Sequence, residues 1–197
     1  MSTVASKRAA KIERIHDVAA SLFAERGYYG TRMEDIAAGL ELQKGALYYY
    51  FDSKEALLAS LVEERVGAAL AVLKEIVARD TTATQRARTA VTGHLSVFQE
   101  NADIYTIFNT ERLHSISKGA AEKVNELGRE YEALWEQLVE EGKRSGEFRS
   151  ELDTRVTIKA VLGACNTTLT WFRKGGSLDI EEVAGRFADL FLDGMRR

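Results

Sequence analysis

The chain has 197 residues, of which 45% are hydrophobic and 29% are charged, and its formal net charge is -3. This balance excludes an extensively disordered chain, because such chains carry few apolar residues and a high net charge. No stretch reaches the roughly 18 consecutive apolar residues of a membrane helix, and the first residues lack the apolar segment of a signal peptide. We therefore expect a cytoplasmic protein with no membrane partner.

Proline is absent from the chain, whereas an average sequence of this length holds roughly ten. Proline is least tolerated inside helices, so its absence favours an all-helical fold. The single cysteine, Cys165, excludes an internal disulfide. Its apolar helical surroundings indicate a packed thiol rather than a nucleophile.

The first predicted helix covers residues 7–26 and ends before Gly27, a typical C-terminal stop. Its apolar residues recur at three- and four-residue spacing, which places them on one face: Ile12, Ile15, Ala19, Leu22 and Phe23. Residues 1–54 hold eight basic and seven acidic residues, a net +1, so the remainder carries -4. A basic arm near the start of the chain consists of Lys7, Arg8, Lys11 and Arg14. Either a solvent-exposed helix face or a contact with nucleic acid would explain it.

Two short helices follow, with a tight polar turn between them. Thr31 and Glu34 fit a capping box, which predicts a helix over residues 32–39. A turn at residues 40–42 leads to a helix over residues 43–51, and residues 52–55 carry another cap signature. Together these helices predict a three-helix unit over residues 1–53, with a helix-turn-helix at about 32–51.

Six further helices are predicted over residues 54–197. The first runs from Lys54 to Val77, and Thr82 caps the next, which reaches about Glu100. The others start at Asp103, cover 124–146, run from a cap at Asp153 to about Phe172, and follow a cap at Asp179. The predicted architecture is thus all-α, with nine helices arranged as a helix-turn-helix domain and a six-helix domain.

The residue chemistry of the helix over 43–51 distinguishes it from helix pairs that never contact DNA. The helical period turns Leu47 and Phe51 inward and leaves Tyr48 and Tyr49 outside, where uncovered aromatic rings are costly. Gln43 and Lys44 can reach purine edges in a major groove, and tyrosine hydroxyls can donate to phosphates. This pattern predicts a DNA-binding surface.

Residues 7–58 resemble the N-terminal domain of the TetR family of transcriptional regulators, on the run AERGYYGTRMEDIAAGLELQKGALYYYFDSKEALL. From the motif and the resemblance we predict these DNA contacts: Thr31, Arg32, Gln43, Lys44, Gly45, Ala46, Tyr48, Tyr49 and Lys54. Two positions depart from the family pattern. Glu41 replaces the usual turn glycine and loses its conformational ease if it is left-handed, and Gln43 is a weaker N-cap than the usual serine.

The resemblance implies a ligand cavity in the large domain and a homodimer joined by the last two helices. For the dimer interface we predict Val183, Phe187, Leu190 and Phe191, although packing on their own domain would explain them equally. A dimer would present two recognition helices about 34–36 Å apart to a palindromic operator of double-stranded DNA. An effector would act by favouring another separation.

For the ligand site we predict a mixed aromatic and polar set: Phe98, Ile104, Tyr105, Phe108, Arg112, Tyr131, Trp135, Asn166, Thr167, Thr170, Trp171 and Arg173. Many of these could be plain core, but polar side chains on an apolar helix face must find partners or line a cavity. The run GEFRSELDTRVTIKAVLGACNTTLTWFRKGG is similar to that of relatives that respond to acyl-coenzyme A thioesters in fatty-acid or steroid breakdown. A drug-like effector, as in regulators of drug efflux, is the alternative.

Other functional classes fit the sequence less well. Three histidines, His16, His94 and His114, stand apart without metal-ligand spacing, and no phosphate-binding glycine motif occurs. We therefore predict no catalysis, metal or cofactor. An architectural DNA protein would need a strong positive charge, which the acidic remainder does not supply. The sequence predicts a ligand-responsive repressor.

Overall fold

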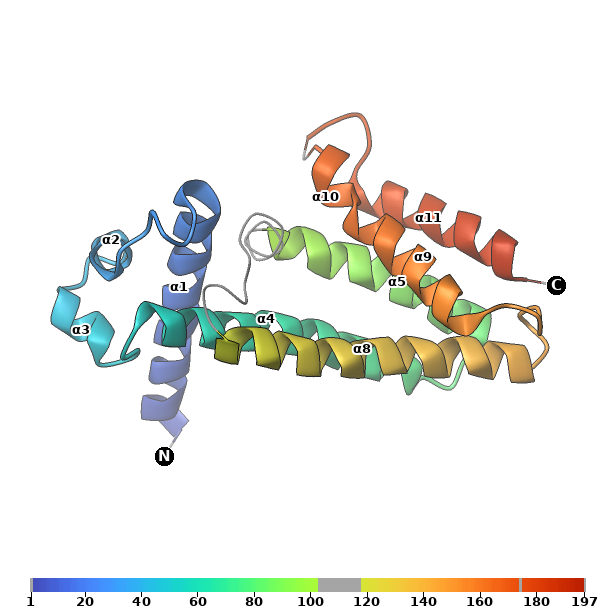
Figure 1. Ribbon diagram of the computed structural model, residues 1–197, viewed down its shortest axis with the longest axis horizontal. Coiled ribbons are helices and arrows are strands. Elements are labelled where there is room, and N and C mark those ends of the chain that lie inside the picture. The colour runs from blue at the N-terminus through green and yellow to red at the C-terminus, as the bar shows by residue number, and fades with distance from the viewer. Residues whose placement is uncertain (1, 103–117, 174, 197) are drawn as a thin grey trace. The chain divides into compact units, whose positions relative to one another are not determined.

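The computed structural model describes residues 2–102, 118–173 and 175–196, which form helices and connecting turns, with one isolated bridge between Phe148 and Arg196 (Figure 1). Within these ranges no strand is present, which confirms the all-α prediction. None of the helices found there combines the length and apolar character needed to cross a membrane. The chain divides into two compact units, Met1–Val66 with Asp103–Asn125, and Gly67–Ala102 with Glu126–Arg197.

The first unit contains α1 (Ser2–Arg26), α2 (Met33–Gly39), α3 (Lys44–Tyr48) and the start of α4 (Lys54–Val77). Its core buries apolar residues from each of these helices, including Ile15, Phe23, Ile36, Leu47 and Leu57. The helix α3 is shorter than the predicted 43–51, and in the turn that follows it the amides of Tyr50 and Phe51 both donate to the carbonyl of Leu47. Leu47 and Phe51 are buried, as predicted.

The predicted capping box of Thr31 and Glu34 is wrong. The Thr31 hydroxyl is buried and donates to the carbonyls of Leu22, at 3.1 Å, and Gly27, at 2.9 Å. The N-cap of α2 is Arg32, whose backbone amide donates to the Asp35 carboxylate at 2.8 Å. The Thr31 side chain therefore hydrogen-bonds to the end of α1 and does not cap α2.

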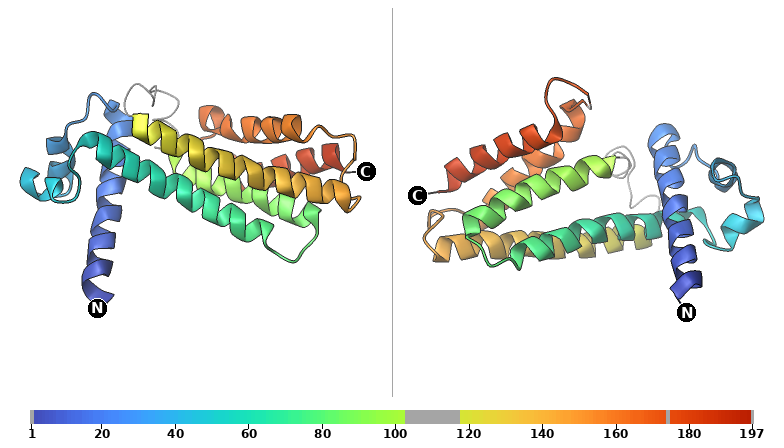
Figure 2. Two further views of the ribbon diagram at one scale, coloured as in Figure 1. Left: turned by 60° about the horizontal axis from the view of Figure 1, so that its bottom comes forward. Right: turned by 180° about the vertical axis from the view of Figure 1, so that it is seen from behind.

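The second unit is built from α5 (Ala83–Glu100), α9 (Thr154–Asn166), α10 (Thr168–Trp171) and α11 (Ile180–Met195), with the end of α4 and most of α8 (Lys118–Arg144). The helix α5 packs against α11 and α9 (Figure 2). Three predicted N-caps are confirmed, because Thr82, Asp153 and Asp179 each accept a hydrogen bond from an amide three residues on.

The predicted count of nine helices is not met in the described residues. The predicted helix from Asp153 to Phe172 is interrupted at Thr167, and α10 continues it for a single turn. Near this break Thr167 and Thr168 donate their hydroxyls to Ala164 and Cys165 carbonyls, a local bonding that bends helices. Counted with α10 as part of α9, the described residues form eight helices, and the helix predicted from Asp103 lies outside them.

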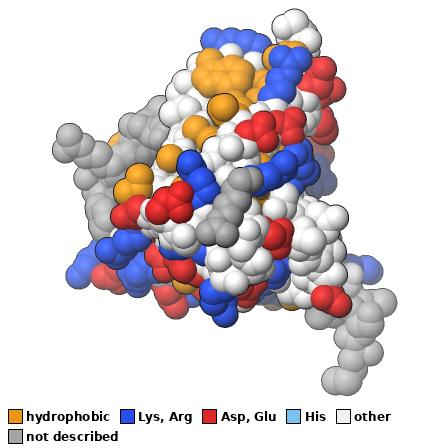
Figure 3. Space-filling view, turned by 90° about the vertical axis from the view of Figure 1, so that its right-hand side faces the viewer, with side chains coloured by type: hydrophobic (Ala, Val, Ile, Leu, Met, Phe, Trp, Pro, Cys, Tyr) orange, Lys and Arg blue, Asp and Glu red, His pale blue; other side chains and the backbone are white. Residues whose placement is uncertain are grey.

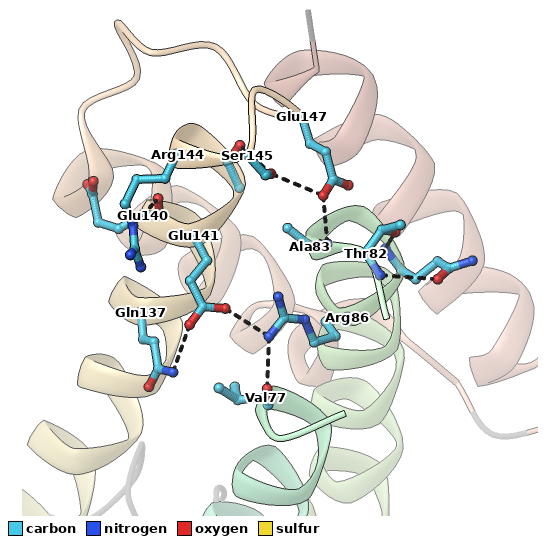
Figure 4. A network of polar contacts seen from close by, with 12 residues as sticks. Val77, Thr82, Ala83, Arg86, Gln137, Glu140, Glu141, Arg144, Ser145 and Glu147 are labelled. Carbon is cyan, nitrogen blue, oxygen red and sulfur yellow. Dashed lines mark hydrogen bonds and ion pairs between the residues drawn. The ribbon is translucent and has the colours of Figure 1, made fainter. Parts of the chain in front are cut away.

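A polar network fastens the start of α5 to the end of α8 (Figure 4). The Glu147 carboxylate accepts from the amides of Ala83, at 3.0 Å, and Thr84, at 2.9 Å, at the N-terminus of α5. Burial would raise the pKa of Glu147, but these amide bonds outweigh it and lower the pKa to about 2. Nearby, Arg86 bridges the Glu141 carboxylate at 2.8 Å and a backbone carbonyl of α4. These contacts tie the start of α5 to the end of α4, to the end of α8 and to the segment after it.

Candidate functional site

The turn between α2 and α3 takes a left-handed residue. Glu41 has φ 56, and its amide bonds to Ala38 while the amide of Leu42 reaches back to Ala37. This bonding is the Schellman pattern that usually places glycine at the Glu41 position. Glu41 therefore takes the left-handed conformation in which it loses the conformational ease of the family's glycine.

The exposed side of α3 carries small and aromatic residues. Gln43 precedes the helix in extended conformation and makes no cap bond with its side chain, and Gly45 and Ala46 are exposed. Tyr48 is 39% exposed and Tyr49 is 75% exposed. The side chain of Lys44 lies outside the described set. A tip of small residues lets a helix approach base edges closely, and the tyrosines beside it can donate to phosphates.

Two predicted phosphate contacts, Thr31 and Lys54, face the protein instead. The Lys54 ammonium donates to the carbonyls of Tyr28, at 2.6 Å, and Thr31, at 2.7 Å, and lies 4.1 Å from the centroid of the Tyr28 ring. The backbone carbonyls that follow α1 attract the positive charge of the Lys54 ammonium, so they hold this side chain in place. Both side chains therefore fix the turn between α1 and α2, while Arg32 stays exposed.

The basic arm at the start of α1 runs beside the end of α3. The guanidinium carbon of Arg8 lies 6.0 Å from the centroid of the Tyr50 ring, which itself meets the Tyr49 ring edge to face at 5.2 Å. Lys7 is exposed as well.

Sequence reasoning passed over Tyr29, which is largely exposed next to the buried Tyr28. In the sequence, the only feature that pointed to Tyr29 was the pair of aromatic residues after Gly27.

In the second unit, His94 joins two predicted ligand residues. Its Nδ1 lies 2.8 Å from the Tyr131 hydroxyl oxygen, and its Nε2 lies 3.0 Å from Oδ1 of Asn166. The three residues come from α5, α8 and α9. Sequence reasoning missed His94, because an isolated histidine carries no spacing signal and only the packing of the three helices brings its partners to it.

An apolar cavity lies between α5, α8, α9 and α11, with Trp135 in its wall. The other lining residues are Ala87, Val91, Leu138, Val139, Thr157, Ile158, Val161, Phe191, Leu192 and Met195. Its volume is about 10 Å³, room for one water molecule, whereas drug-sized ligands occupy roughly 300–1,000 Å³. At this volume the cavity does not hold a drug-sized ligand.

Several other predicted ligand residues lie away from this cavity. Thr167 and Thr170 are exposed and donate their hydroxyls to carbonyls of their own helix, so their polarity is satisfied locally. Trp171 and Arg173 are exposed too, which corrects the prediction that they line the cavity. Four predicted residues, Ile104, Tyr105, Phe108 and Arg112, lie outside the described residues, as does the side chain of Phe98.

Burial sets the protonation of the polar groups in this core. Desolvation lowers the pKa of His94 to about 4, partly opposed by its hydrogen bond to Asn166. Desolvation also raises the pKa of Tyr131, against a smaller opposing effect of its side-chain hydrogen bond with the Trp135 indole. Burial raises the pKa of Cys165 to about 12, so the thiol is inert and packed, as predicted. At neutral pH the cluster is therefore uncharged.

An exposed apolar stripe runs along α11. Leu190 is 68% exposed, and Phe187 and Phe191 are half-buried with their rings 5.7 Å apart. Hydrophobic side chains gather in the upper part of Figure 3, on the side of α10 and α11. Val183 is 2% exposed and belongs to the interior of the chain, which corrects its assignment to an interface. Trp171, at 6.3 Å from Phe187, extends the stripe.

Two family models match the chain. Residues 15–61 match "Bacterial regulatory proteins, tetR family", and residues 80–195 match "Tetracyclin repressor-like, C-terminal domain". The transcriptional repressor KstR2 of Rhodococcus jostii is 29% identical over 91% of this chain and 88% of its own.

Two solved structures are similar. The ketosteroid transcriptional regulator KstR2 of Mycobacterium tuberculosis superposes with a TM-score of 0.84 at 23% identity, covering 95% of each chain. The transcriptional regulator FadR of Bacillus subtilis in complex with stearoyl-CoA superposes with a TM-score of 0.76 at 25% identity, covering 92% of this chain and 98% of its own. The first likeness shows the fold alone.

Proposed function

The chain belongs to the TetR family of bacterial regulatory proteins, and we propose that it is a repressor that binds a palindromic operator as a homodimer and releases it on binding an acyl-coenzyme A thioester. The exposed face of α3 is the observation that carries the DNA part. Both family models describe regulators, and we infer that the chain acts in the cytoplasm without catalysis or cofactor.

We divide the protein into a DNA-binding domain over 1–53 and an effector and dimer domain over 54–197. The residues that we assign to direct DNA contact are Arg32, Gln43, Lys44, Gly45, Ala46, Tyr48 and Tyr49. We now assign Thr31 and Lys54 to positioning, since their polar atoms bond to backbone carbonyls. Two copies would set their α3 helices about one DNA turn apart.

Dimer formation is supported by Leu190 of α11, which is 68% exposed, together with the half-buried Phe187 and Phe191 beside it. A second copy would cover Leu190 and the exposed parts of the two phenylalanine rings. A single near-neutral DNA-binding domain makes few phosphate contacts, so two linked copies would be needed for useful affinity.

An acyl-coenzyme A effector is supported by the similar FadR of Bacillus subtilis, whose structure holds stearoyl-CoA. In this chain the closed apolar cavity beside Trp135 could widen around an acyl chain. The effector would favour a conformation whose two α3 helices no longer fit the operator.

A gel-shift assay tests the DNA part of the proposal. We expect the protein to bind the DNA flanking its own gene more tightly than random DNA, and Tyr49→Ala to lose roughly tenfold in affinity with folding intact by circular dichroism. Arg155→Ala is the matched control, because Arg155 is an exposed residue of the other unit. Equal affinity for both DNAs would refute the specific repressor.

The same assay with added acyl-coenzyme A thioesters of varied chain length tests the effector. We expect release of the DNA at micromolar concentrations by thioesters of a preferred length and none by coenzyme A alone. If no chain length released the DNA, the acyl-coenzyme A effector would be wrong, while operator binding would stand on its own result.

A further inference from the structure

The basic arm lies on a part of α1 that has little contact with the rest of the first unit. In Figures 1 and 2 the first turns of α1 project past the start of α4. Residues 6–10 are all exposed, and so is Arg14, whereas Lys11 is half-buried. A short helical segment without packing partners is only marginally stable in water. These turns would therefore gain stability from a partner that covers them.

The cations of the basic arm gather on one side of α1. Residues three and four apart share a face of a helix, so Lys7, Lys11 and Arg14 line the same side. His16 comes nine residues after Lys7, which places it about half a turn further round the helix. It is buried and binds Glu64 of α4. The basic side of α1 therefore faces away from α4.

The protein does not neutralise these charges itself. Residues 7–14 hold four cations and one acid, Glu13. Within the described parts of the chain, none of the four cations forms an ion pair with a carboxylate, whereas Asp17 of the same helix is paired with Arg65 of α4. A local excess of unpaired positive charge attracts an anionic partner.

The order of charges along α1 does not suit a helix that faces only water. The positive end of a helix dipole is stabilised by acids in the first turn and disfavours cations nearby. The first turn of α1 holds no acid, and Lys7 and Arg8 follow in the second turn. An external anion beside these turns would offset the unfavourable arrangement. This favours a bound anion over a merely solvent-exposed face.

The basic arm is continuous with the proposed DNA surface of α3. The guanidinium carbon of Arg8 lies 6.0 Å from the centroid of the Tyr50 ring. Tyr50 in turn meets the ring of Tyr49, which is 75% exposed. A guanidinium that lies over an aromatic ring can still direct the N–H groups of its edge to a phosphate. Any DNA that contacts Tyr49 would thus run close to Arg8.

Resting on the proposed function, we propose that the basic arm binds DNA phosphates beside the groove that α3 enters. Arg8 bonds to a phosphate next to the tyrosines, and Lys7 and Arg14 neutralise further phosphates along the exposed side of α1. Contacts to phosphates carry no base information. The basic arm therefore adds affinity and salt dependence to each protomer, and it leaves the choice of operator to α3.

Salt-dependent binding tests this inference on the full chain. Fluorescence anisotropy measures binding to labelled DNA that flanks the protein's own gene, and to random DNA, from about 50 to 200 mM KCl. The variant Lys7→Gln with Arg14→Gln should lower the slope of log affinity against log salt by about two per protomer, since each phosphate contact contributes about 0.9. Affinity at about 100 mM KCl should fall roughly tenfold on both DNAs, so their affinity ratio stays unchanged.

A matched control removes the same charge elsewhere. Arg79→Gln with Arg155→Gln replaces two exposed cations of the second unit, and the slope should stay unchanged. Glutamine has nearly the helix propensity of lysine and arginine, so circular dichroism should show an intact α1.

A charge-conserving variant tests whether the charge itself is what binds. Lys7→Arg with Arg14→Lys keeps both charges and should keep the slope of the unaltered protein. Arg8→Gln alone should lower the slope by about one per protomer.

The outcomes separate this inference from the proposed function. If the Lys7 and Arg14 variant keeps its slope and affinity, or if the control loses as much, the inference is overturned and the operator repressor stands. If the unaltered protein binds both DNAs equally, the specific repressor is wrong, and the slope on random DNA still decides whether the basic arm binds phosphates. A protein that binds neither DNA would overturn both.

Discussion

The surface of α3 and the core around His94 present their functional groups in opposite ways. On α3 the relevant side chains are exposed, close in sequence and displayed by one short helix. Around His94 the hydrogen-bonded side chains come from three helices, with His94 buried and Asn166 exposed, and they satisfy one another. The surface of α3 can therefore be predicted from one short stretch of sequence, whereas the partners of His94 are brought together only by the packing of three helices.

The largest expected effect tests how far the α3 surface depends on its buried side. Leu47 is fully buried in the core of the first unit. Leu47→Ala should cost about 2–5 kcal/mol of unfolding free energy by loss of burial and creation of a cavity. Urea denaturation monitored by circular dichroism measures it. A loss below about 1 kcal/mol would mean that α3 is not held by this core.

The second effect is a loss of stability at low pH that the buried His94 causes. The pKa of His94 is lowered to about 4 in the folded chain, below its ordinary value of 6.5, so between these values the unfolded chain binds a proton that the folded chain does not. The stability of the second unit should therefore be full above pH 6.5 and fall as the pH drops towards about 4, by about 3 kcal/mol.

Denaturation curves of the unaltered chain and of His94→Gln, collected from pH 7.5 to 4.5, measure this loss. Glutamine does not titrate, so the variant should show a flatter dependence in this range. Carboxylates such as Glu147, with a pKa lowered to about 2, titrate in both proteins and cancel in the comparison. Parallel curves would contradict the buried neutral His94.

A third, smaller effect separates a positioning lysine from a phosphate-binding one. Lys54→Met should cost about 1–3 kcal/mol of stability, because two carbonyls lose a charged donor. The slope of log affinity against log salt should stay unchanged, since a lysine on a phosphate adds about one to it. Lys118→Met, at an exposed position, controls for loss of charge. A slope reduced by about one would return Lys54 to the DNA contacts.

The smallest expected effect lies in the turn that orients α3. Glu41 holds a left-handed conformation, which costs a non-glycine residue about 1 kcal/mol. Glu41→Gly should therefore raise the free energy of unfolding by up to about 1 kcal/mol and leave operator affinity nearly unchanged. Thermal denaturation and gel shift measure the two quantities. A destabilised Glu41→Gly protein would show that the side chain of Glu41 makes a contribution of its own.

Local sequence signals predicted local structure well. The caps at Thr82, Asp153 and Asp179 need only a short polar residue before an apolar run, and each is present. Thr31 has the same sequence pattern, but its hydroxyl donates to carbonyls at the end of α1 and does not accept from an amide of α2. When a side chain can both donate and accept, packing decides between two local partners.

The two candidate sites differ in the same way: the faces of α3 could be predicted from local sequence, and the partners of His94 could not. The inward and outward faces of α3 follow from helical period, so Leu47, Tyr48 and Tyr49 could be placed from the sequence. The partners of His94 could not, because they lie 37 and 72 residues away along the chain. Thr167 and Thr170 were misread for a related reason, since bonding to their own helix satisfies hydroxyls that pattern alone assigns to a ligand.

The most direct test of the central claim is a DNase footprint on the DNA that flanks the protein's own gene, with and without lauroyl-CoA. We expect one protected site with two-fold symmetry and half-sites about 10 base pairs apart or a multiple of that spacing. Lauroyl-CoA should abolish the protection. The absence of a discrete protected site, or protection that no acyl-coenzyme A relieves, would contradict an effector-released operator repressor.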